Sequence, residues 1–226
     1  MLSVVIPTLN AGDELDRALE ALGKPPWAAT EGEIVVVDGG STDASLAVAR
    51  EAGARTVAAP RGRGSQLSAG AEAARGDWLL FLHADTRLDA SWAEAAGAYI
   101  AEPCNGERAA VFGFALDDPA PAARRLERMV GWRTRQLGLP YGDQGLLIGR
   151  AFYRRLGGFR PIPLMEDVDL VRRIGRSRID VLPATAVTSA ARWRREGWTA
   201  RSARNLLCLG LYFLGVPPRL IARVYR

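Results

Sequence analysis

The segment EIVVVDGGSTD at residues 33–43 contains the unit from which the fold is built. An apolar run at 34–37 ends on Asp38, and two glycines and the helix-capping residues of 41–43 follow it directly. A short continuous apolar run predicts a strand that is buried on both faces. Capping residues after a tight turn are typical of a helix start, so we expect a helix over 44–52.

The same unit recurs on both sides of this segment. Apolar runs predict strands, and helical spacing of apolar residues predicts helices, at 2–7 (strand), 13–22 (helix), 55–58 (strand), 65–74 (helix) and 77–83 (strand). Repeated strand–helix units predict an α/β protein with a mostly parallel central sheet flanked by helices. Ligands of such sheets bind beyond the carboxyl ends of the strands, where Asn10, Asp38 and residues 83–86 fall.

The second half of the chain is less regular. Its patterns predict strands at 111–116 and 146–149, and helices at 121–137, 164–174 and 199–216. The longest apolar stretch, 206–216, has 11 residues, whereas a membrane-spanning helix needs about 20. We therefore expect no membrane span.

Composition excludes several classes of protein. The chain has 226 residues, of which 48% are apolar and 24% charged, so it is neither disordered nor fibrous. Cys104 and Cys208 lie far apart, which argues against a disulfide scaffold or structural zinc and fits a reducing compartment. The N-terminal residues show neither a basic flank nor a cleavage signal. We expect a cytoplasmic protein without a signal peptide.

Charge is distributed unevenly along the chain. Residues 1–118 hold 9 Lys and Arg against 18 Asp and Glu, whereas residues 119–226 hold 21 Arg against 7 acids. An acidic half can hold a metal cation, and a basic half can meet phosphate or an anionic membrane. The aromatic residues are not interleaved with the basic ones along a strand, so we expect no nucleic-acid binding.

Two acidic motifs are candidates for chemistry. Asp85 follows the apolar run 77–83, and a carboxylate at a strand end suits Mg²⁺ or Mn²⁺, with His83 as a second candidate ligand. Glu166 and Asp167 stand close together in the basic half. They indicate either a general base beside a hydroxyl acceptor or simple capping of a helix start, and the pattern alone leaves both open.

Basic and glycine-rich motifs are candidates for phosphate contacts. Arg63 and Gln66 belong to a glycine-containing segment before a helix, which suits a nucleotide phosphate and equally an exposed loop. Gly40 follows Asp38 in a turn where the backbone can approach a ligand. A guanidinium beside an aromatic ring, as at Arg192 and Trp193, suits a diphosphate or a stacked sugar.

Five strings in the same order and spacing resemble glycosyltransferase family 2, whose members have the GT-A fold. They are SVVIPTLN (3–10), IVVVDGGSTD (34–43), GDWLLFLHADT (76–86), GGF (157–159) and PLMEDVDL (163–170). The variants HADT, YGDQGLLI and PLMEDVDL are most similar to a short bacterial branch whose genes are often found near radical-SAM and selenoprotein-type genes.

The resemblance implies an inverting transfer of a sugar from a nucleotide-diphosphate donor, UDP- or GDP-linked, to a hydroxyl acceptor, with Mg²⁺ or Mn²⁺. It implies these roles: Pro7, Thr8 and Asn10 in the first nucleotide-binding loop, Asp38 on the nucleoside, Asp85 on the metal, Asp167 as catalytic base, Glu166 orienting that base or binding acceptor, and Arg192 and Trp193 near the diphosphate.

The chain departs from the family pattern at Ala11, Gly39 and His83, where related sequences carry acids. These departures leave room for a non-catalytic membrane- or partner-binding module on a degenerate transferase fold. A sugar-1-phosphate nucleotidyltransferase is a further alternative. That enzyme class needs a basic glycine-rich loop after the first strand, whereas residues 8–13 here are acidic.

The resemblance also implies a division of the chain. We expect a single GT-A domain over 1–226, with a nucleotide-binding half at 1–118, an acceptor and catalytic half at 119–198, and an amphipathic tail at 199–226. Arginines flank the apolar stretch of the tail, a pattern found in helices that cover a sheet and in helices that lie on anionic lipid. Peripheral contact with the inner face of the cell membrane and a homodimer both stay open.

Overall fold

A computed structural model describes residues 1–28 and 30–225 of the chain. Its strands are β1 (Leu2–Thr8), β2 (Gly32–Asp38), β3 (Arg55–Ala58), β4 (Trp78–Phe81), β5 (Thr86–Leu88), β6 (Ala109–Leu116), β7 (Leu146–Gly149) and β8 (Ile179–Thr188). Its α-helices are α1 (Gly12–Leu22), α2 (Ser45–Glu51), α3 (Arg63–Ala73), α4 (Trp92–Ala101), α5 (Pro121–Leu137), α6 (Arg150–Arg155), α7 (Glu166–Ile174), α8 (Ala191–Glu196), α9 (Trp198–Phe213) and α10 (Pro218–Tyr225). Short 3-10 turns are η1 (Pro103–Glu107), η2 (Gly142–Gln144) and η3 (Arg176–Arg178).

The strands of the described residues form one eight-stranded sheet in the order β3-β2-β1-β4-β7-β6-β8-β5. β3, β2, β1 and β4 pair in parallel, as their apolar runs predict. β7 pairs antiparallel with β4 and β6, β5 pairs antiparallel with β8, and β6 pairs parallel with β8. The prediction of a mostly parallel α/β sheet is confirmed, with antiparallel pairings confined to the second half of the order.

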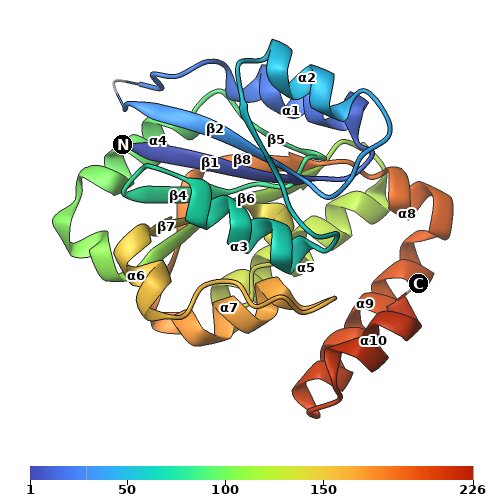
Figure 1. Cartoon of the computed structure of the whole chain (residues 1–226). Helices are drawn as coiled ribbons and strands as arrows, with labels where there is room; N and C mark the ends of the chain where they lie inside the picture. The colour runs from blue at the N-terminus through green and yellow to red at the C-terminus, as the bar shows by residue number, and fades with distance from the viewer. Residues whose placement is uncertain (29, 226) are drawn as a thin grey trace.

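Helices cover both faces of this sheet (Figure 1). On one face, α1, α2 and α4 pack through apolar side chains such as Leu15, Leu19 and Trp92. On the other face, α3, α6 and α7 pack through Leu67, Phe152 and other apolar side chains. The predicted strands at 34–37 and 2–7 are therefore buried between two helical layers.

Single residues explain how closely α3 packs on the sheet and where α7 begins. A Cβ on Gly70 of α3 would overlap the side chains of Val5 and Val37, so the glycine lets this helix lie close against β1 and β2. α3 begins at Arg63, which corrects the expectation of a flexible basic loop there. α7 begins at Glu166 because Met165 has a left-handed backbone conformation with φ of 66°.

Several elements were not predicted. β8 mixes buried and exposed positions and contains a proline and small polar residues, so it carries no continuous apolar run. β5 has three residues and forms by pairing with β8, which is about 100 residues away in the chain. α4 and α6 were also missed. These elements depend on tertiary partners more than on local pattern.

The predicted helix at 199–216 is present as α9, and α10 packs beside it to form a C-terminal hairpin, residues 198–225 (Figure 1). Its inner side packs on the segment before and within α7 through Cys208, Ile221 and their partners Leu164, Met165 and Val168. Within residues 1–28 and 30–225, the structure has no helix both long and apolar enough to cross a membrane. The functional division of the chain at 118 and 198 stays a prediction.

Candidate active site

The loops that follow β1 and β2 are locked to each other at the carboxyl edge of the sheet. Asn10, with φ of 50°, accepts a hydrogen bond at Oδ1 from the Thr42 N–H (2.8 Å). Its own N–H donates to Ser41 Oγ (2.9 Å), and the Gly12 N–H donates to Asp43 Oδ2 (3.0 Å). Polar residues of 10–12 and 41–43 therefore fix the shape of this edge before any ligand arrives.

A cavity lies over this edge, which we call the loop cavity. It encloses about 1240 Å³, part of it open to solvent. Its walls come from the loop after β1, the start of α3, the loop after β4 and the start of α8, and they are formed by Pro7, Thr8, Leu9, Asn10, Ala11, Glu14, Arg61, Gly62, Arg63, Gln66, His83, Ala84, Asp85, Ser189, Ala191, Arg192 and Arg195.

A second cavity, which we call the hairpin cavity, lies between α7, η2, α8 and the C-terminal hairpin. It encloses about 730 Å³, again partly open. Its lining residues are Arg63, His83, Asp85, Tyr141, Gly142, Asp143, Leu164, Met165, Asp167, Val168, Thr188, Ser189, Arg192, Trp193, Arg201, Asn205 and Tyr225. Asp85 and Asp167, 82 positions apart in the chain, thus face one cavity.

The two cavities share a wall. Within the described residues, Arg63, His83, Asp85, Ser189 and Arg192 line both of them. Four of these side chains are titratable or charged groups that the sequence analysis selected, and two of them are arginines. The carboxylate of Asp85 therefore stands at the boundary between a polar loop cleft and a cavity that contains Asp167.

The Asp167 carboxylate is held by backbone N–H groups. Its Oδ2 accepts a hydrogen bond from the Gly142 N–H (2.9 Å), and its Oδ1 accepts one from the Val168 N–H (2.8 Å). A Cβ on Gly142 would lie 2.5 Å from His83 Nε2 and 3.5 Å from Asp167 Oδ2. The glycine therefore allows η2, His83 and Asp167 to pack against one another.

Glu166 does not line either cavity among the described residues. Its carboxylate is 1% exposed and forms an ion pair with Arg63 Nε at 2.7 Å. The pair joins the first turn of α3 to the first turn of α7 and holds the Arg63 guanidinium at the shared wall. Burial raises the pKa of Glu166, and the Glu166 charge raises the pKa of Arg63.

Three predicted nucleotide contacts are engaged in local structure. The Asp38 carboxylate accepts hydrogen bonds from the N–H groups of Gly40 (3.0 Å) and Ser41 (3.1 Å), and neither Asp38 nor Gly40 is among the lining residues of the two cavities. Gln66 lines the loop cavity, but its Nε2 donates to the carbonyls of Thr8 (2.7 Å) and Val37 (2.8 Å). The binding roles of these residues stay predictions.

Burial changes the pKa of two groups in the hairpin cavity, His83 and Asp143, in opposite directions. Loss of contact with water, aided by the Arg63 charge, lowers the pKa of His83 to about 4, so this imidazole is neutral at pH 7. Burial raises the pKa of Asp143 to about 6. A neutral imidazole keeps a lone pair that can accept a hydrogen bond or bind a cation.

The residues at the wall fit a divalent cation that is shared with phosphate. Among the described residues, no group of three or more His, Cys, Asp or Glu side chains could hold a metal ion by itself. Mg²⁺ commonly binds through one or two carboxylates and completes its coordination with water and substrate phosphates. Asp85 meets that requirement, and the buried Oδ1 of Asp143 in the same cavity has no hydrogen-bond partner.

Comparison with known protein families decides the classification. The sequence model of "Glycosyl transferase family 2" matches residues 3–155, more than half of the chain. The chain belongs to glycosyl transferase family 2.

Relatives of this family 2 chain include the "PGL/p-HBAD biosynthesis glycosyltransferase" of Mycobacterium bovis (strain BCG / Pasteur 1173P2), which is 36% identical over 95 residues. The match spans 39% of this chain and 36% of the length of that relative.

Solved structures show the same fold. S. aureus TarS 1-349 in complex with UDP-GlcNAc has a TM-score of 0.62 and 19% identity over 83% of this chain and 58% of that chain. The mannosyltransferase PcManGT from Pyrobaculum calidifontis in complex with GDP-Man and Mn²⁺ has a TM-score of 0.65 and 18% identity over 90% and 59%. The predicted GT-A fold is confirmed.

In this family 2 chain, sequence reasoning missed the contribution of the C-terminal hairpin. Arg201 and Asn205 of α9 and Tyr225 of α10 line the hairpin cavity. Arg201 and Asn205 are spaced four residues apart, which places them on one face of a helix. That spacing was visible in the sequence, but nothing local showed which cavity this face would meet. Trp193 also lines the hairpin cavity and is absent from the lining of the loop cavity, and its place near the diphosphate stays a prediction.

Proposed function

We propose that the chain transfers a sugar from a nucleotide-diphosphate donor to a hydroxyl acceptor, with inversion at the anomeric carbon. The observation that carries this proposal is the shared wall: Asp85 faces both cavities, and Asp167 faces the second one. Two substrates can therefore meet beside a cation-binding carboxylate and a carboxylate able to take a proton. Membership of family 2 supports the same reaction.

The donor nucleotide occupies the loop cavity. Pro7, Thr8 and Asn10 present the locked loop after β1 to the nucleoside. Among the residues that the structure describes, the buried Thr8 Oγ1 has no hydrogen-bond partner, which leaves it for a ligand. The diphosphate lies toward the shared wall, where the guanidinium groups of Arg63 and Arg192 can meet its oxygens. UDP- and GDP-linked sugars are the donors to examine first, because the solved structures with this fold bind them.

Asp85, with His83 beside it, would hold Mg²⁺ or Mn²⁺ together with the diphosphate. When bound, such a cation acts as a Lewis acid that offsets the negative charge growing on the leaving group. Glu166 is a positioning residue, because its ion pair directs Arg63 toward the same wall. Arg63 and Arg192 add positive charge there without any change of protonation.

Asp167 acts as the general base. The acceptor hydroxyl attacks the anomeric carbon from the face opposite the diphosphate, its proton passes to the Asp167 carboxylate, and the bond from the anomeric carbon to the diphosphate oxygen breaks. The N–H groups of Gly142 and Val168 keep the carboxylate oriented during this step. General-base assistance of this kind is worth a factor of about 10²–10⁴ in rate.

Two variants test the proposal. Asp85→Ala should lose Mn²⁺-dependent binding of UDP- or GDP-sugars in calorimetry, because it removes the carboxylate at the shared wall. Asp167→Asn should bind the donor as the wild type does and lose at least about 100-fold in transfer. Full turnover by Asp167→Asn with an accepted hydroxyl substrate would assign the base elsewhere. The product's anomeric configuration, read by NMR, tests inversion.

The alternatives make different predictions in the same assays. A sugar-1-phosphate nucleotidyltransferase would release pyrophosphate from a nucleoside triphosphate and a sugar phosphate. A non-catalytic module would bind no nucleotide sugar with or without Mn²⁺. The assignment of the chain to the short bacterial branch, whose genes are often found near radical-SAM and selenoprotein-type genes, stays a prediction. Identifying the neighbouring genes would test it.

A second proposal concerns location, and we infer that the outer side of the C-terminal hairpin rests on an anionic lipid surface. Large apolar side chains with more than 40% exposure concentrate there among the described residues: Leu206, Leu207, Phe213, Leu214, Leu220 and Val224. Exposed Arg219 and Arg223 accompany them on α10. Apolar side chains with adjacent arginines match a membrane with anionic headgroups.

A further inference from the structure

The inner side of the C-terminal hairpin forms part of the hairpin cavity, opposite the elements that carry Asp85 and Asp167. Figure 1 shows α9 starting where α8 ends, so that the two helices bring their residues to the same region. Trp193 of α8 and Arg201 of α9 are buried side chains in this wall, with exposures of 8% and 6%. The Arg201 guanidinium carbon lies 4.9 Å from the centre of the Trp193 ring.

Within residues 1–28 and 30–225, three polar atoms of this wall are buried and have no hydrogen-bond partner: Trp193 Nε1, Arg201 Nε and Asn205 Oδ1. All three side chains line the hairpin cavity. A buried polar atom without a partner is costly, and native proteins rarely keep several together without a reason. Two N–H donors and one oxygen acceptor are thus unsatisfied among the side chains that line the cavity.

Arg201 belongs to a group of arginines around Glu196. Its Nη1 contacts Glu196 Oε2 at 2.9 Å, its Nη2 donates to the Tyr225 hydroxyl at 3.1 Å, and Arg204 Nη1 pairs with the same carboxylate at 2.9 Å. The unpaired N–H groups of Trp193 Nε1 and Arg201 Nε need an acceptor, whereas Asn205 Oδ1 needs a donor. The wall therefore suits groups that both accept and donate hydrogen bonds, which is the property of hydroxyl groups.

Aromatic and aliphatic side chains form another part of the cavity wall. Tyr141, Tyr225 and the Trp193 ring line it together with Leu164 and Met165. Amphipathic rings beside unpaired donors and acceptors suit a ligand with hydroxyls at its edges and C–H groups on its faces. This combination is the chemistry of a carbohydrate ring.

We propose that Trp193, Arg201 and Asn205 form an acceptor subsite for a neutral carbohydrate or glycoside. The inference rests on the proposed transferase function and specifies its acceptor. One sugar hydroxyl of the acceptor lies beside Asp167. Other hydroxyls of the same ring or the next ring form hydrogen bonds with Trp193 Nε1, Arg201 Nε and Asn205 Oδ1. The C-terminal hairpin is in this way a part of the acceptor site.

Trp193→Phe is the sharpest test, because it keeps an aromatic ring and removes an N–H that has no partner in the described part of the chain. Asn205→Ala removes the acceptor oxygen, and Trp132→Phe on the exposed face of α5 is the matched control. The probes are neutral methyl glycosides and, in a separate arm, sugar phosphates and 3-phosphoglycerate. Each is incubated with UDP- or GDP-sugar and Mn²⁺, and products are detected by mass spectrometry.

Transfer to a neutral glycoside should occur, and each of the two variants should raise KM for that acceptor about three- to tenfold, with the KM for donor unchanged. The Trp193 ring also packs against Leu116, Ala123 and Ala190, so Trp193→Phe should lower the thermal midpoint through lost packing, and the test depends on the rise in acceptor KM beside an unchanged donor KM. An unchanged acceptor KM in both variants, or transfer to the anionic probes alone, overturns the subsite. Loss of donor binding in the wild type would instead refute the proposed function.

Discussion

Gly142 shows how one missing side chain positions the candidate base. Its N–H donates to Asp167 Oδ2, and its Cα faces His83 so closely that a Cβ would lie 2.5 Å from Nε2. The predicted motif around 141–144 contained this glycine, and its role as a packing requirement became visible only with His83 and Asp167 placed beside it.

Gly142→Ala should lower kcat at least about tenfold, because the added methyl must displace His83 or the carboxylate that the backbone N–H holds. A displacement of about 1 Å in a group that positions the reacting atoms can slow a reaction by a factor of about 100. Gly106→Ala is the control, since nothing lies within 4 Å of its added Cβ. Steady-state kinetics with donor and acceptor at saturation measures the change, and equal kcat values for both variants would contradict the packing role.

At the scale of elements, an ion-pair network ties β8 to α4 and to the start of β6. Arg108 Nε donates to Asp180 Oδ2 at 2.7 Å, and the Tyr99 hydroxyl donates to the same oxygen at 2.9 Å. The hydrogen bond from Arg108 lowers the pKa of Asp180. β8 also pairs with β5, so this network stabilises the part of the sheet that local pattern did not predict.

The network should make stability depend on pH in the acid range. A carboxyl whose pKa is lower in the folded state stabilises the protein above its unfolded pKa of about 3.9, and this contribution is lost as pH falls through the folded value. Asp180→Asn should thus cost ~0.5–1 kcal/mol at pH 7, given that both side chains are partly exposed, and progressively less below pH 4. Urea unfolding from pH 7 to pH 3 measures this, with exposed Glu102→Gln as control.

Sequence patterns predicted the elements that have a clear local period. The runs at 2–7 and 34–37 are almost continuously apolar and form buried strands, and the helix at 121–137 is amphipathic, so none of them requires knowledge of its partners. β8 alternates in burial and β5 is short, so both depend on pairing that a local pattern does not contain.

The candidate site likewise combines residues that sequence motifs predicted with residues that only tertiary packing brings to it. Asp85 and Asp167 follow recognisable patterns and were predicted to meet, and the structure places both in one cavity. Arg201 and Asn205 enter that cavity only because the hairpin folds back on the segment before α7 through Leu164 and Met165. The resemblance implied that Glu166 orients the base or binds acceptor, and the structure shows its carboxylate paired with Arg63, a partner that the sequence did not indicate.

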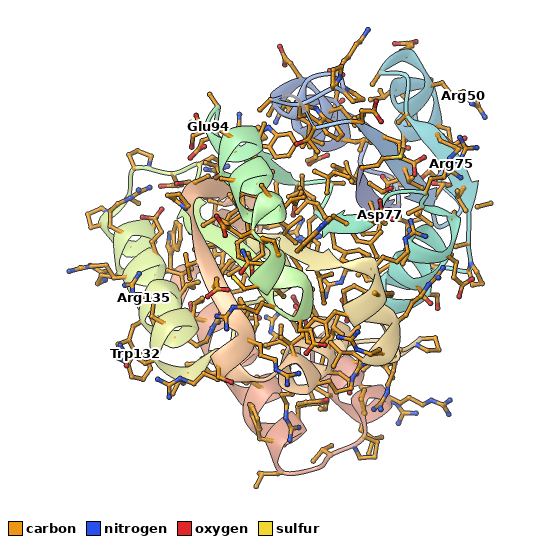
Figure 2. All side chains as sticks on the ribbon, turned by 90° about the vertical axis from the view of Figure 1, so that its left-hand side faces the viewer. Arg50, Arg75, Asp77, Glu94, Trp132 and Arg135 are labelled. Carbon is orange, nitrogen blue, oxygen red and sulfur yellow. The ribbon has the colours of Figure 1, made fainter. Side chains whose placement is uncertain are left out.

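At the scale of the whole molecule, exposed apolar residues are not confined to the hairpin. Figure 2 shows Trp132 and Arg135 on the outer side of α5, pointing away from the sheet. Met129 on the same helix is 41% exposed, and Leu214 at the turn of the hairpin is 82% exposed. A membrane test therefore needs a variant from each location.

The intact chain should co-sediment with vesicles that contain phosphatidylglycerol and much less with pure phosphatidylcholine. Leu214→Gln with Leu220→Gln should weaken that binding at least about tenfold, because both side chains leave the apolar surface of the hairpin. Met129→Gln on α5 is the matched control. Equal sedimentation of all variants would refute the lipid contact, and concentration-dependent dimers that the hairpin variant abolishes would assign the surface to a second copy of the chain.

The wall shared by the loop cavity and the hairpin cavity has a consequence for the order of events. Both cavities are partly open to solvent and Asp85 lines both of them, so under the proposed function neither substrate has to pass through the other's cavity to reach Asp85. An unreactive deoxy analogue of the acceptor should accordingly be a competitive inhibitor against the acceptor and a noncompetitive one against the donor, whereas obligatory binding of the donor first would make it uncompetitive against the donor. The first pattern describes a ternary complex assembled by random addition, in which a scarce acceptor does not trap the nucleotide on the protein.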